Sequence, residues 1–374
     1  FEIEGYPLPY DGRDLMTHID VRPEATVLTY THAAFTARQI IFAPIDEPGV
    51  VMLLDVDTAR PLQVAGVFRH DLRLMWPAGM PTATIGWDDA QGVYTVQDPS
   101  QQYVAKIAAP GARDVSIMPY QEEPRDVPTR FVLDIAPEQA TQSLYPIAIA
   151  GSMEGPEAAQ QTIDRLLSDV PTLYQQNVEY YRDLRAQTLD VTTPNEDLNT
   201  ALDWATIGID KGMVTNPMLG TGLIAGYRTS GASERPGFAW FFGRDALWTA
   251  LAITSYGDLT STRTALDFLK QYQREDGRIP HEISQSAPLV DWFEEYPYPW
   301  NSADATPLYL IVHADHYAAT GDRAYLEANW QSIKQAYQFT AGTDTDGDHL
   351  IENVNVGHGW VEGGELYPAQ EEIY

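Results

Sequence analysis

The spacing of the apolar residues changes near residue 155, and this change divides the chain into two parts. Before it, short apolar runs such as 50–58 (VVMLLDVDT) and 62–70 (LQVAGVFRH) lie between clusters of Pro, Gly and Asp. In the second run one face is formed by alternate residues: Leu62, Val64, Gly66 and Phe68. Alternation of this kind predicts a strand with one buried face. Many short strands separated by turn residues indicate an antiparallel β-sandwich, which we assign to residues 1–152.

The second part has apolar residues at helical spacing. Two helices predicted over 156–170 and 171–187 each begin with a proline, at a position where a helix does not use the N–H group. They form a helical linker, residues 153–194. From 195 to 374 the predicted apolar stripes are Leu198, Leu202, Ala205 and Ile209; Leu247, Ala250, Leu251 and Thr254; Ala265, Phe268, Leu269 and Tyr272; Leu310, Ala314, Tyr317 and Ala318; and Leu326, Trp330, Ile333 and Tyr337. These stripes predict a helical domain with long connecting loops, and such loops are often functional.

The charge of the chain excludes several classes of partner. It has 23 Lys and Arg against 53 Asp and Glu, a net charge of −30. Such a field repels nucleic acid and anionic membranes. No apolar run approaches the roughly 20 residues that span a bilayer, so we expect a soluble protein without a nucleic-acid or membrane partner.

The chain has no cysteine, which excludes disulfides. The compartment stays open, and we expect the cytoplasm in preference to secretion or the periplasm.

Three segments of the second part combine aromatic side chains with Arg or carboxylates. They are 237–248 (GFAWFFGRDALW), 291–309 (DWFEEYPYPWNSADATPLY) and 357–368 (GHGWVEGGELYP). A sugar presents apolar C–H faces, which aromatic rings cover, and hydroxyl edges, which carboxylates and guanidinium groups bind. We therefore expect these segments to form a cleft for a neutral carbohydrate.

Five motifs in residues 237–364 resemble one known family. In chain order they are FFGRDALWTAL, QREDGRIPHEIS, WNSADATPLYL, DTDGDHLIEN and GHGWVEGG. They resemble the amylo-α-1,6-glucosidase family, which forms the C-terminal catalytic domain of glycogen debranching enzymes and is related to the glucoamylases. The resemblance implies a multidomain β plus α chain, in which an (α/α)₆ toroid follows a β-sandwich. It also implies an exo-acting, inverting hydrolase of α-1,6- or α-1,4-linked gluco-oligosaccharides.

The resemblance places the general acid at Glu362. In this clan the acid sits in a Trp-x-acid motif, and Trp360 precedes Glu362 by two positions. A carboxyl group that loses solvation beside an indole holds its proton to higher pH, and can then protonate a leaving glycosidic oxygen. Glu365 and a solvated loop glutamate are the alternatives.

The resemblance also implies a set of sugar-binding residues. Arg244 and Asp245 match a pair that binds two hydroxyls of the terminal sugar, with a helix cap by Asp245 as the alternative. The other expected contacts are Trp240, His281, Glu282, Trp300, Asp304 and Trp360. Each of these tryptophans is equally compatible with a place in the core.

An acidic loop follows the last predicted helix. Asp344, Asp346 and Asp348 stand at alternate positions, with Glu352 four residues further on. Carboxylates this close repel one another unless water or a hard cation such as Ca²⁺ lies between them. Glycine at the fourth position is not the EF-hand pattern, which has glycine at the sixth. A structural calcium site and a solvated acidic turn remain the alternatives, and the expected chemistry requires no cofactor.

The predicted helices supply only part of the implied toroid. The family's barrel has twice as many helices as residues 196–374 provide, and its general base lies in the later part. Glu371 and Glu372 match no position for that base. We therefore expect the first part of a larger enzyme, with the remaining half of the barrel and an oligosaccharide as partners. A disaccharide phosphorylase of the same clan and a catalytically inactive sugar-binding protein are the alternative functions.

Overall fold

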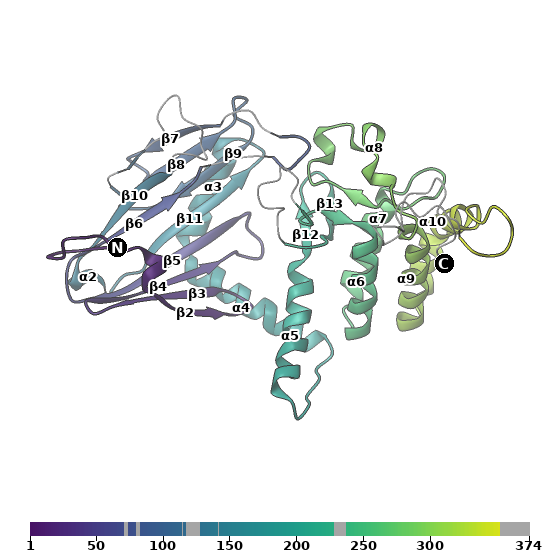
Figure 1. Ribbon diagram of the computed structural model, residues 1–374, viewed down its shortest axis with the longest axis horizontal. Helices are drawn as coiled ribbons and strands as arrows, with labels where there is room; N and C mark the ends of the chain where they lie inside the picture. The colour runs from purple at the N-terminus through teal and green to yellow at the C-terminus, as the bar shows by residue number, and fades with distance from the viewer. Residues whose placement is uncertain are drawn as a thin grey trace, which may run out of the picture. The chain divides into compact units, whose positions relative to one another are not determined.

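The chain forms two compact units, here described from a computed structural model (Figure 1). The β unit comprises Phe1–Arg73 and Met80–Asp183, and the helical unit comprises Leu74–Gly79 and Leu184–Tyr374. The residues that the structure describes are 1–70, 74–79, 83–113, 115–116, 128–140, 142–227 and 237–351. The expected combination of an antiparallel β domain with helices is confirmed. No helix in these ranges is long and apolar enough to cross a membrane.

The β unit is built from two antiparallel sheets. Its strands are β1 (Glu2–Ile3), β2 (Met16–Val21), β3 (Thr26–His32), β4 (Phe35–Phe42), β5 (Gly49–Thr58), β6 (Leu62–Phe68), β7 (Thr84–Asp88), β8 (Val93–Gln97), β9 (Val104–Ala108), β10 (Thr129–Ile135) and β11 (Tyr145–Ser152). The larger sheet has eight strands in the order β2-β3-β4-β5-β11-β9-β8-β7, and the smaller one has three in the order β1-β6-β10. Its helices are α1 (Gly12–Leu15), α2 (Pro137–Ala140), α3 (Pro156–Ser168) and most of α4 (Val170–Gln187).

The alternation predicted for residues 62–68 builds the core between the two sheets. Leu62 and Val64 of β6 are buried in one cluster with Phe131 of β10 and with side chains of the larger sheet. Gly66 lies opposite Phe131 in the register of the smaller sheet. A Cβ atom at residue 66 would lie 2.3 Å from the Phe131 ring, so glycine is what allows that ring to lie across β6.

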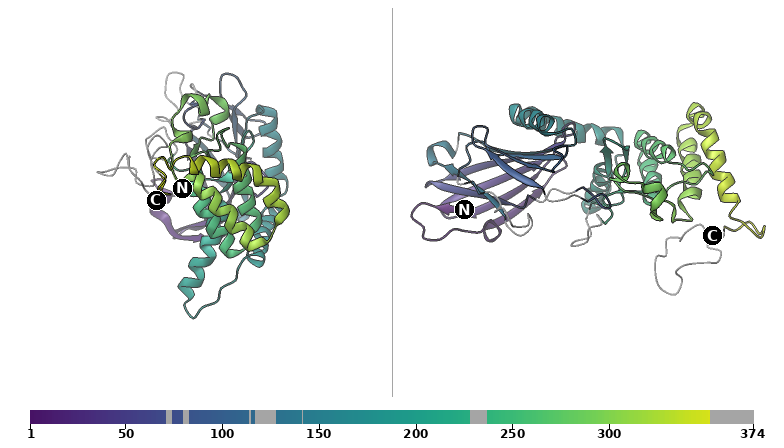
Figure 2. Two further views of the ribbon diagram at one scale, coloured as in Figure 1. Left: turned by 90° about the vertical axis from the view of Figure 1, so that its right-hand side faces the viewer. Right: turned by 90° about the horizontal axis from the view of Figure 1, so that it is seen from above.

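Helices cover the other face of the larger sheet (Figure 2). Ile163 and Leu166 of α3 are buried against Val51 of β5 and Ala148 of β11. The next helix, α4, is held by Asn177, whose amide nitrogen donates to the Ala43 carbonyl at 2.8 Å and whose amide oxygen accepts from the Ile45 N–H at 3.1 Å. The central strands β5, β9 and β11 of the larger sheet are therefore covered on both faces.

The helical unit alternates long helices with loops that carry short strands. Its elements are α5 (Glu196–Lys211), β12 (Met213–Asn216), β13 (Gly220–Leu223), β14 (Phe241–Phe242), α6 (Gly243–Tyr256), α7 (Leu259–Gln271), β15 (Glu282–Ile283), η1 (Ala287–Leu289), α8 (Trp292–Glu295), η2 (Tyr298–Trp300), α9 (Ala305–Thr320) and α10 (Arg323–Ala341). α6 packs against α5, α7 and α9, and α10 packs against α9. Asn195, Asp258 and Asp322 cap α5, α7 and α10 by accepting backbone N–H groups of the first turn.

A segment from the first half of the chain completes the aromatic core of the helical unit. The Trp76 ring lies 5.7 Å from the Trp240 ring and 5.8 Å from the Trp292 ring, measured between centroids. The Ser284 hydroxyl donates to the Trp76 carbonyl at 2.6 Å. Residues 74–79 therefore belong to the helical unit, although the strands before and after them belong to the β unit. Sequence periodicity does not predict this exchange.

The predicted stripes of α6 and α7 lie in the core, whereas those of α5, α9 and α10 are largely exposed. The buried members of the first two are Leu247, Ala250, Ala265, Phe268 and Leu269. On α10 the buried face is instead Tyr325, Asn329, Ser332 and Ala336, and the stripe residues Trp330 and Tyr337 are 54% and 63% exposed. Leu198 and Leu202 of α5 and Tyr317 of α9 are exposed as well. Three helices thus carry a second apolar face that the described core does not cover.

Two histidines are buried where α9 packs on its neighbours. His313 and His316 are 3% and 1% exposed and lie against the Tyr325 ring of α10. The charged groups of α7 on this side are Arg263, Asp267 and Lys270; Asp267 accepts from the Tyr325 hydroxyl at 2.9 Å, and Lys270 donates to Asn329 at 2.7 Å. Burial, followed by repulsion from His316 and Lys270, lowers the pKa of His313 to about 4. His313 is therefore neutral in the folded protein at neutral pH.

Acid should destabilise the helical unit through His313. Its folded pKa of about 4 lies below the unfolded value of 6.5, so the unfolded chain binds the proton first. The stability that the neutral ring contributes is complete above pH 6.5 and is lost as the pH falls toward 4, by about 3 kcal/mol in all. We expect His313→Gln to flatten the pH dependence of unfolding in this window. Denaturant unfolding between pH 7.5 and pH 4 measures it, with the exposed His18→Gln as control; equal slopes for wild type and His313→Gln would contradict the assignment.

Candidate functional site

The first turns of α6 and α9 meet at a buried ion pair. Arg244 lies in the first turn of α6, and Asp304 directly precedes α9. Arg244 Nε donates to Asp304 Oδ2 at 2.5 Å, and the two side chains are 11% and 7% exposed. Asp304 Oδ1 accepts from the Ser302 hydroxyl. Both carboxylate oxygens are thus engaged, and charge-assisted bonds of this kind fix the direction of the guanidinium group.

The loop before α6 packs closely against residues 278–283. The Gly243 N–H donates to the His281 carbonyl at 2.7 Å, and the His281 N–H donates to the Pro299 carbonyl at 2.7 Å. A Cβ atom at residue 243 would lie 2.1 Å from the Pro280 carbonyl oxygen, so only glycine permits this approach. The backbone thereby brings three predicted segments together: the one with Arg244, the one with His281, and the one that contains Asp304.

His281 and Glu282 form the buried polar part of this site. Their side chains are 4% and 10% exposed, and His281 Nε2 lies 3.9 Å from Glu282 Oε1. Strand pairing places Glu282 opposite Phe242, directly before the first turn of α6. The Glu282 carbonyl accepts from the Trp292 indole N–H at 3.0 Å, which ties this strand to α8.

An aromatic depression of about 500 Å³ opens in the same loop region of the helical unit. It is lined by Tyr272, Gln273, Arg274, Glu275, Phe293, Glu294 and Trp300. The Arg274 guanidinium lies 4.8 Å above the Trp300 ring, and the Tyr272 and Phe293 rings stack with centroids 5.5 Å apart. Hydrogen bonds from Arg274 lower the pKa of Asp276 and keep that carboxylate ionised. Apolar rings beside charged and amide groups suit the faces and hydroxyl edges of a sugar.

The structure distinguishes between the two central tryptophans proposed as sugar contacts. Trp300 is half-buried and lines the depression. Trp240 has no exposed surface and packs against Trp76, Phe242 and Trp292. It therefore has no open face for a sugar and supports the loop from within the core, which is the alternative that the sequence left open.

Asp245 lies in the first turn of α6 and is half-buried. The N-cap position of this helix belongs to Phe242, so Asp245 is not the capping residue. Its neighbour Arg244 is bound by Asp304, a residue 60 positions further along the chain. The predicted sugar contact by Asp245 remains a prediction.

Several predicted residues lie outside the described part of the chain. They are the expected acid Glu362, the expected contact Trp360, the alternatives Glu365, Glu371 and Glu372, and the predicted calcium ligand Glu352. Their roles therefore rest on the sequence motif alone.

The three aspartates of the acidic loop lie together. One carboxylate oxygen from each of Asp344, Asp346 and Asp348 lies within 4.8 Å of the others. Asp344 also accepts the N–H groups of Gly347 at 2.7 Å and His349 at 3.1 Å, so the turn is held by its own backbone. The oxygen ligands suit Ca²⁺ by type. Self-supported turns of this kind also occur without a cation, and the calcium site stays a prediction.

Arg278 and Ser302 belong to this region but were not singled out from the sequence. Arg278 Nη2 donates to the Ser302 carbonyl at 3.1 Å, and the Arg278 side chain is buried. Burial, together with repulsion from Arg274, lowers the pKa of Arg278 to about 10. The sequence contains one indication of Arg278. It is a basic residue in a strongly acidic chain, and it lies in the motif DGRIPHE close to the proposed contacts His281 and Glu282.

Comparison with solved structures shows that this fold is similar to that of a bacterial glucoamylase. A bacterial glucoamylase complexed with acarbose matches 85% of this chain and 48% of its own, with a TM-score of 0.56 and 13% sequence identity. A GH92 family glycosyl hydrolase and a family GH92 α-mannosidase from Bacteroides thetaiotaomicron align at TM-scores of 0.28 and 0.27, with 11% and 8% identity over 85% and 86% of this chain and 47% and 50% of theirs. The chain thus spans about half the length of the structures it matches. No protein-family model and no curated protein matches it.

The match to the glucoamylase shows a shared fold. The specific resemblance to debranching enzymes remains a prediction from the five motifs.

Breaking the Arg244–Asp304 pair should destabilise the helical unit, because one charged group is left buried without its partner. We expect Arg244→Gln to lower the free energy of unfolding of the helical unit by about 3–5 kcal/mol. The matched control is Arg323→Gln, which removes the exposed pair with Glu327 in the same unit and should cost less than about 1 kcal/mol. Calorimetric or denaturant unfolding measures both. Equal, small effects of the two substitutions would show that the buried pair does not hold α6 to α9.

Proposed function

We propose that this chain is the first part of an exo-acting, inverting glycoside hydrolase of α-1,6- or α-1,4-linked glucosides. The observation that carries the proposal is the Arg244–Asp304 ion pair, which holds a guanidinium group at the first turn of α6. It occurs in a glucoamylase-like fold, in the same unit as an aromatic depression suited to sugar rings. The five motifs in chain order support the same class.

Arg244 would act by positioning the substrate. Its guanidinium group is held by Asp304 and so does not have to be ordered when a sugar arrives. A donor group fixed in advance binds hydroxyls at a lower entropic cost and holds the anomeric carbon in place for attack. Asp245, in the same turn, would accept a hydrogen bond from a second hydroxyl, and Trp300 would cover the face of a neighbouring ring.

Glu362 would supply the proton. In an inverting reaction the acid protonates the glycosidic oxygen as the bond to the anomeric carbon breaks, while a base removes a proton from the water that attacks the opposite face. The two carboxyl groups are then about 6.5–9.5 Å apart. We place the base in the remainder of the parent protein.

The helical unit exposes apolar side chains on several helices, and this supports further helices as its partner. Trp330 and Tyr337 of α10, Trp248 of α6 and Ile311 of α9 are all more than half exposed. Apolar surface removed from water stabilises by roughly 25 cal/mol per Å², so these faces favour burial against further helices. The remaining half of an (α/α)₆ barrel would cover them, and would also bring the base.

The decisive experiment is glucose release by the full-length parent protein. We expect activity on maltose, isomaltose or a limit dextrin, and a loss of about 10²–10⁴-fold in Glu362→Gln, because proton transfer by a positioned acid contributes that much. Glu365→Gln is the matched control and should retain activity. Sugar binding, measured separately by calorimetry, should survive the Glu362 substitution.

Other outcomes lead to the alternatives. Cleavage that requires added phosphate would indicate a phosphorylase, and binding without any cleavage would indicate a sugar-binding protein. If Glu365→Gln rather than Glu362→Gln abolishes turnover, the acid is Glu365. Activity that neither substitution reduces would contradict an acid on this loop.

A second measurement tests the proposed helical partner. The isolated chain should self-associate through its exposed stripe, and Trp330→Lys with Tyr337→Lys should reduce this, as seen by light scattering. In the full-length parent the same pair should instead destabilise the barrel by several kcal/mol, since burying these rings is worth about 2–3 kcal/mol each. Leu8→Lys, an exposed apolar residue of the β unit, is the control. No destabilisation of the parent would show that this face is not an internal one.

A further inference from the structure

The β unit contains a cavity that its two sheets leave between them. The larger sheet has eight strands and the smaller one three. Because neighbouring strands lie about 4.8 Å apart, the smaller sheet is less than half as wide as the face it opposes. A cavity of about 520 Å³ lies between the two inner faces. This volume is within the range of about 300–1,000 Å³ that is typical of sites for small organic molecules.

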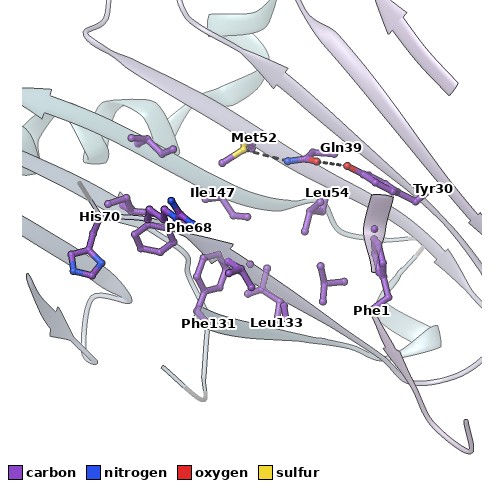
Figure 3. Close-up of a pocket in the computed structure, with 18 of the residues that line it drawn as sticks. Phe1, Tyr30, Gln39, Met52, Leu54, Phe68, His70, Phe131, Leu133 and Ile147 are labelled. Carbon is purple, nitrogen blue, oxygen red and sulfur yellow. Dashed lines mark hydrogen bonds between the residues drawn. The ribbon is translucent and has the colours of Figure 1, made fainter. Parts of the chain in front are cut away.

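The cavity is long and mostly apolar (Figure 3). Phe1 and Tyr30 lie at one end and His70 at the other, with Phe131 and Ile147 between them. Residues 64–70 all line it, and at about 3.3 Å per residue this stretch measures roughly 20 Å. The shape suits an extended hydrocarbon chain better than a compact ring system.

Two polar side chains of the lining, Tyr30 and Gln39, bind one another, and a third, His70, is bound to Thr129. The Tyr30 hydroxyl donates to Gln39 Oε1 at 2.9 Å, and Gln39 Nε2 donates to the Met52 sulfur at 3.3 Å. A sugar placed here would bury hydroxyl groups with too few partners, which is unfavourable. The lining therefore selects a hydrocarbon over a carbohydrate, and the site is chemically different from the one in the helical unit.

The charged side chain in the lining indicates which polar group a bound hydrocarbon would carry. Arg69 is exposed, lines the cavity, and makes no ion pair with any residue in the described ranges. No Asp or Glu is found among the described lining residues, although acidic side chains outnumber basic ones more than twofold in the whole chain. Among the described lining residues, the one charged side chain is thus a basic one, in a chain of net charge −30.

We propose that this cavity binds an alkyl carboxylate, with the hydrocarbon chain between the two sheets and the carboxylate at Arg69. A guanidinium group binds a carboxylate through charge-assisted hydrogen bonds, and the apolar lining replaces the water around the chain. The proposal stands on the β unit alone and does not depend on the glycosidase assignment.

The test is calorimetric binding of dodecanoate and dodecanol to the full chain, below the concentrations at which either aggregates. We expect saturable binding of both at one site. Arg69→Gln should weaken dodecanoate about tenfold and leave dodecanol unchanged, because only the carboxylate meets the guanidinium group. Arg22→Gln, a change of the same charge away from the cavity, is the control.

A second variant, which fills the cavity with a larger side chain, tests whether the ligand binds inside it. Met52→Trp adds volume at a half-buried lining position and should abolish binding of both ligands while circular dichroism shows an intact fold. The proposal is overturned if neither ligand binds the wild type saturably, as when the chain itself fills the space. It is equally overturned if Arg69→Gln and Arg22→Gln affect dodecanoate alike, or if folded Met52→Trp binds as well as wild type.

Discussion

The ion pair between Arg244 and Asp304 connects the first turns of two helices, and the geometry of the candidate site depends on it. Asp304 is held in turn by Ser302, and the backbone around Gly243 is held against Pro280. A buried pair of this kind contributes little net stability compared with apolar packing, but losing one partner is costly. Its value for a sugar site is geometric, because a guanidinium group already fixed by one carboxylate presents its donors in one direction.

A second constraint follows from the helices that carry two apolar faces. α6 and α7 bury their stripes within the described core, whereas α5 and α10 present theirs to solvent. The proposed toroid would cover these stripes, because each helix of a toroid contacts neighbours on both sides.

The two units differ in how they could bind a ligand. The helical unit offers aromatic rings beside charged groups, a combination that suits polyhydroxylated molecules. The β unit offers a mostly apolar cavity, whose lining includes the exposed side chain of Arg69. The physical difference lies in the lining side chains. Those of the depression in the first unit include charged and amide groups, whereas those of the cavity in the second are mostly apolar.

The sequence by itself determined the change from β to helical structure near residue 155 and the inward alternation of Leu62 and Val64. Both depend on local periodicity, because a buried face requires apolar side chains at a fixed spacing whatever else the fold does. Composition and motif order also predicted a common site for the segments around Arg244, His281 and Asp304, and the structure brings these segments into contact.

The tertiary structure decided which rings and apolar stripes are buried and which residue pairs with Arg244, and none of these follows from the periodicity of the sequence. Trp76 joins the helical unit and Trp240 lies beneath the site instead of lining it, because burial of a ring depends on contacts with residues far away in the sequence. The partner of Arg244 is Asp304 for the same reason: the approach of two helix N-termini is set by packing and by a glycine that permits it. Which of two apolar stripes on α9 and α10 is buried was likewise decided by the neighbours that each helix has, and no single-helix pattern contains that information.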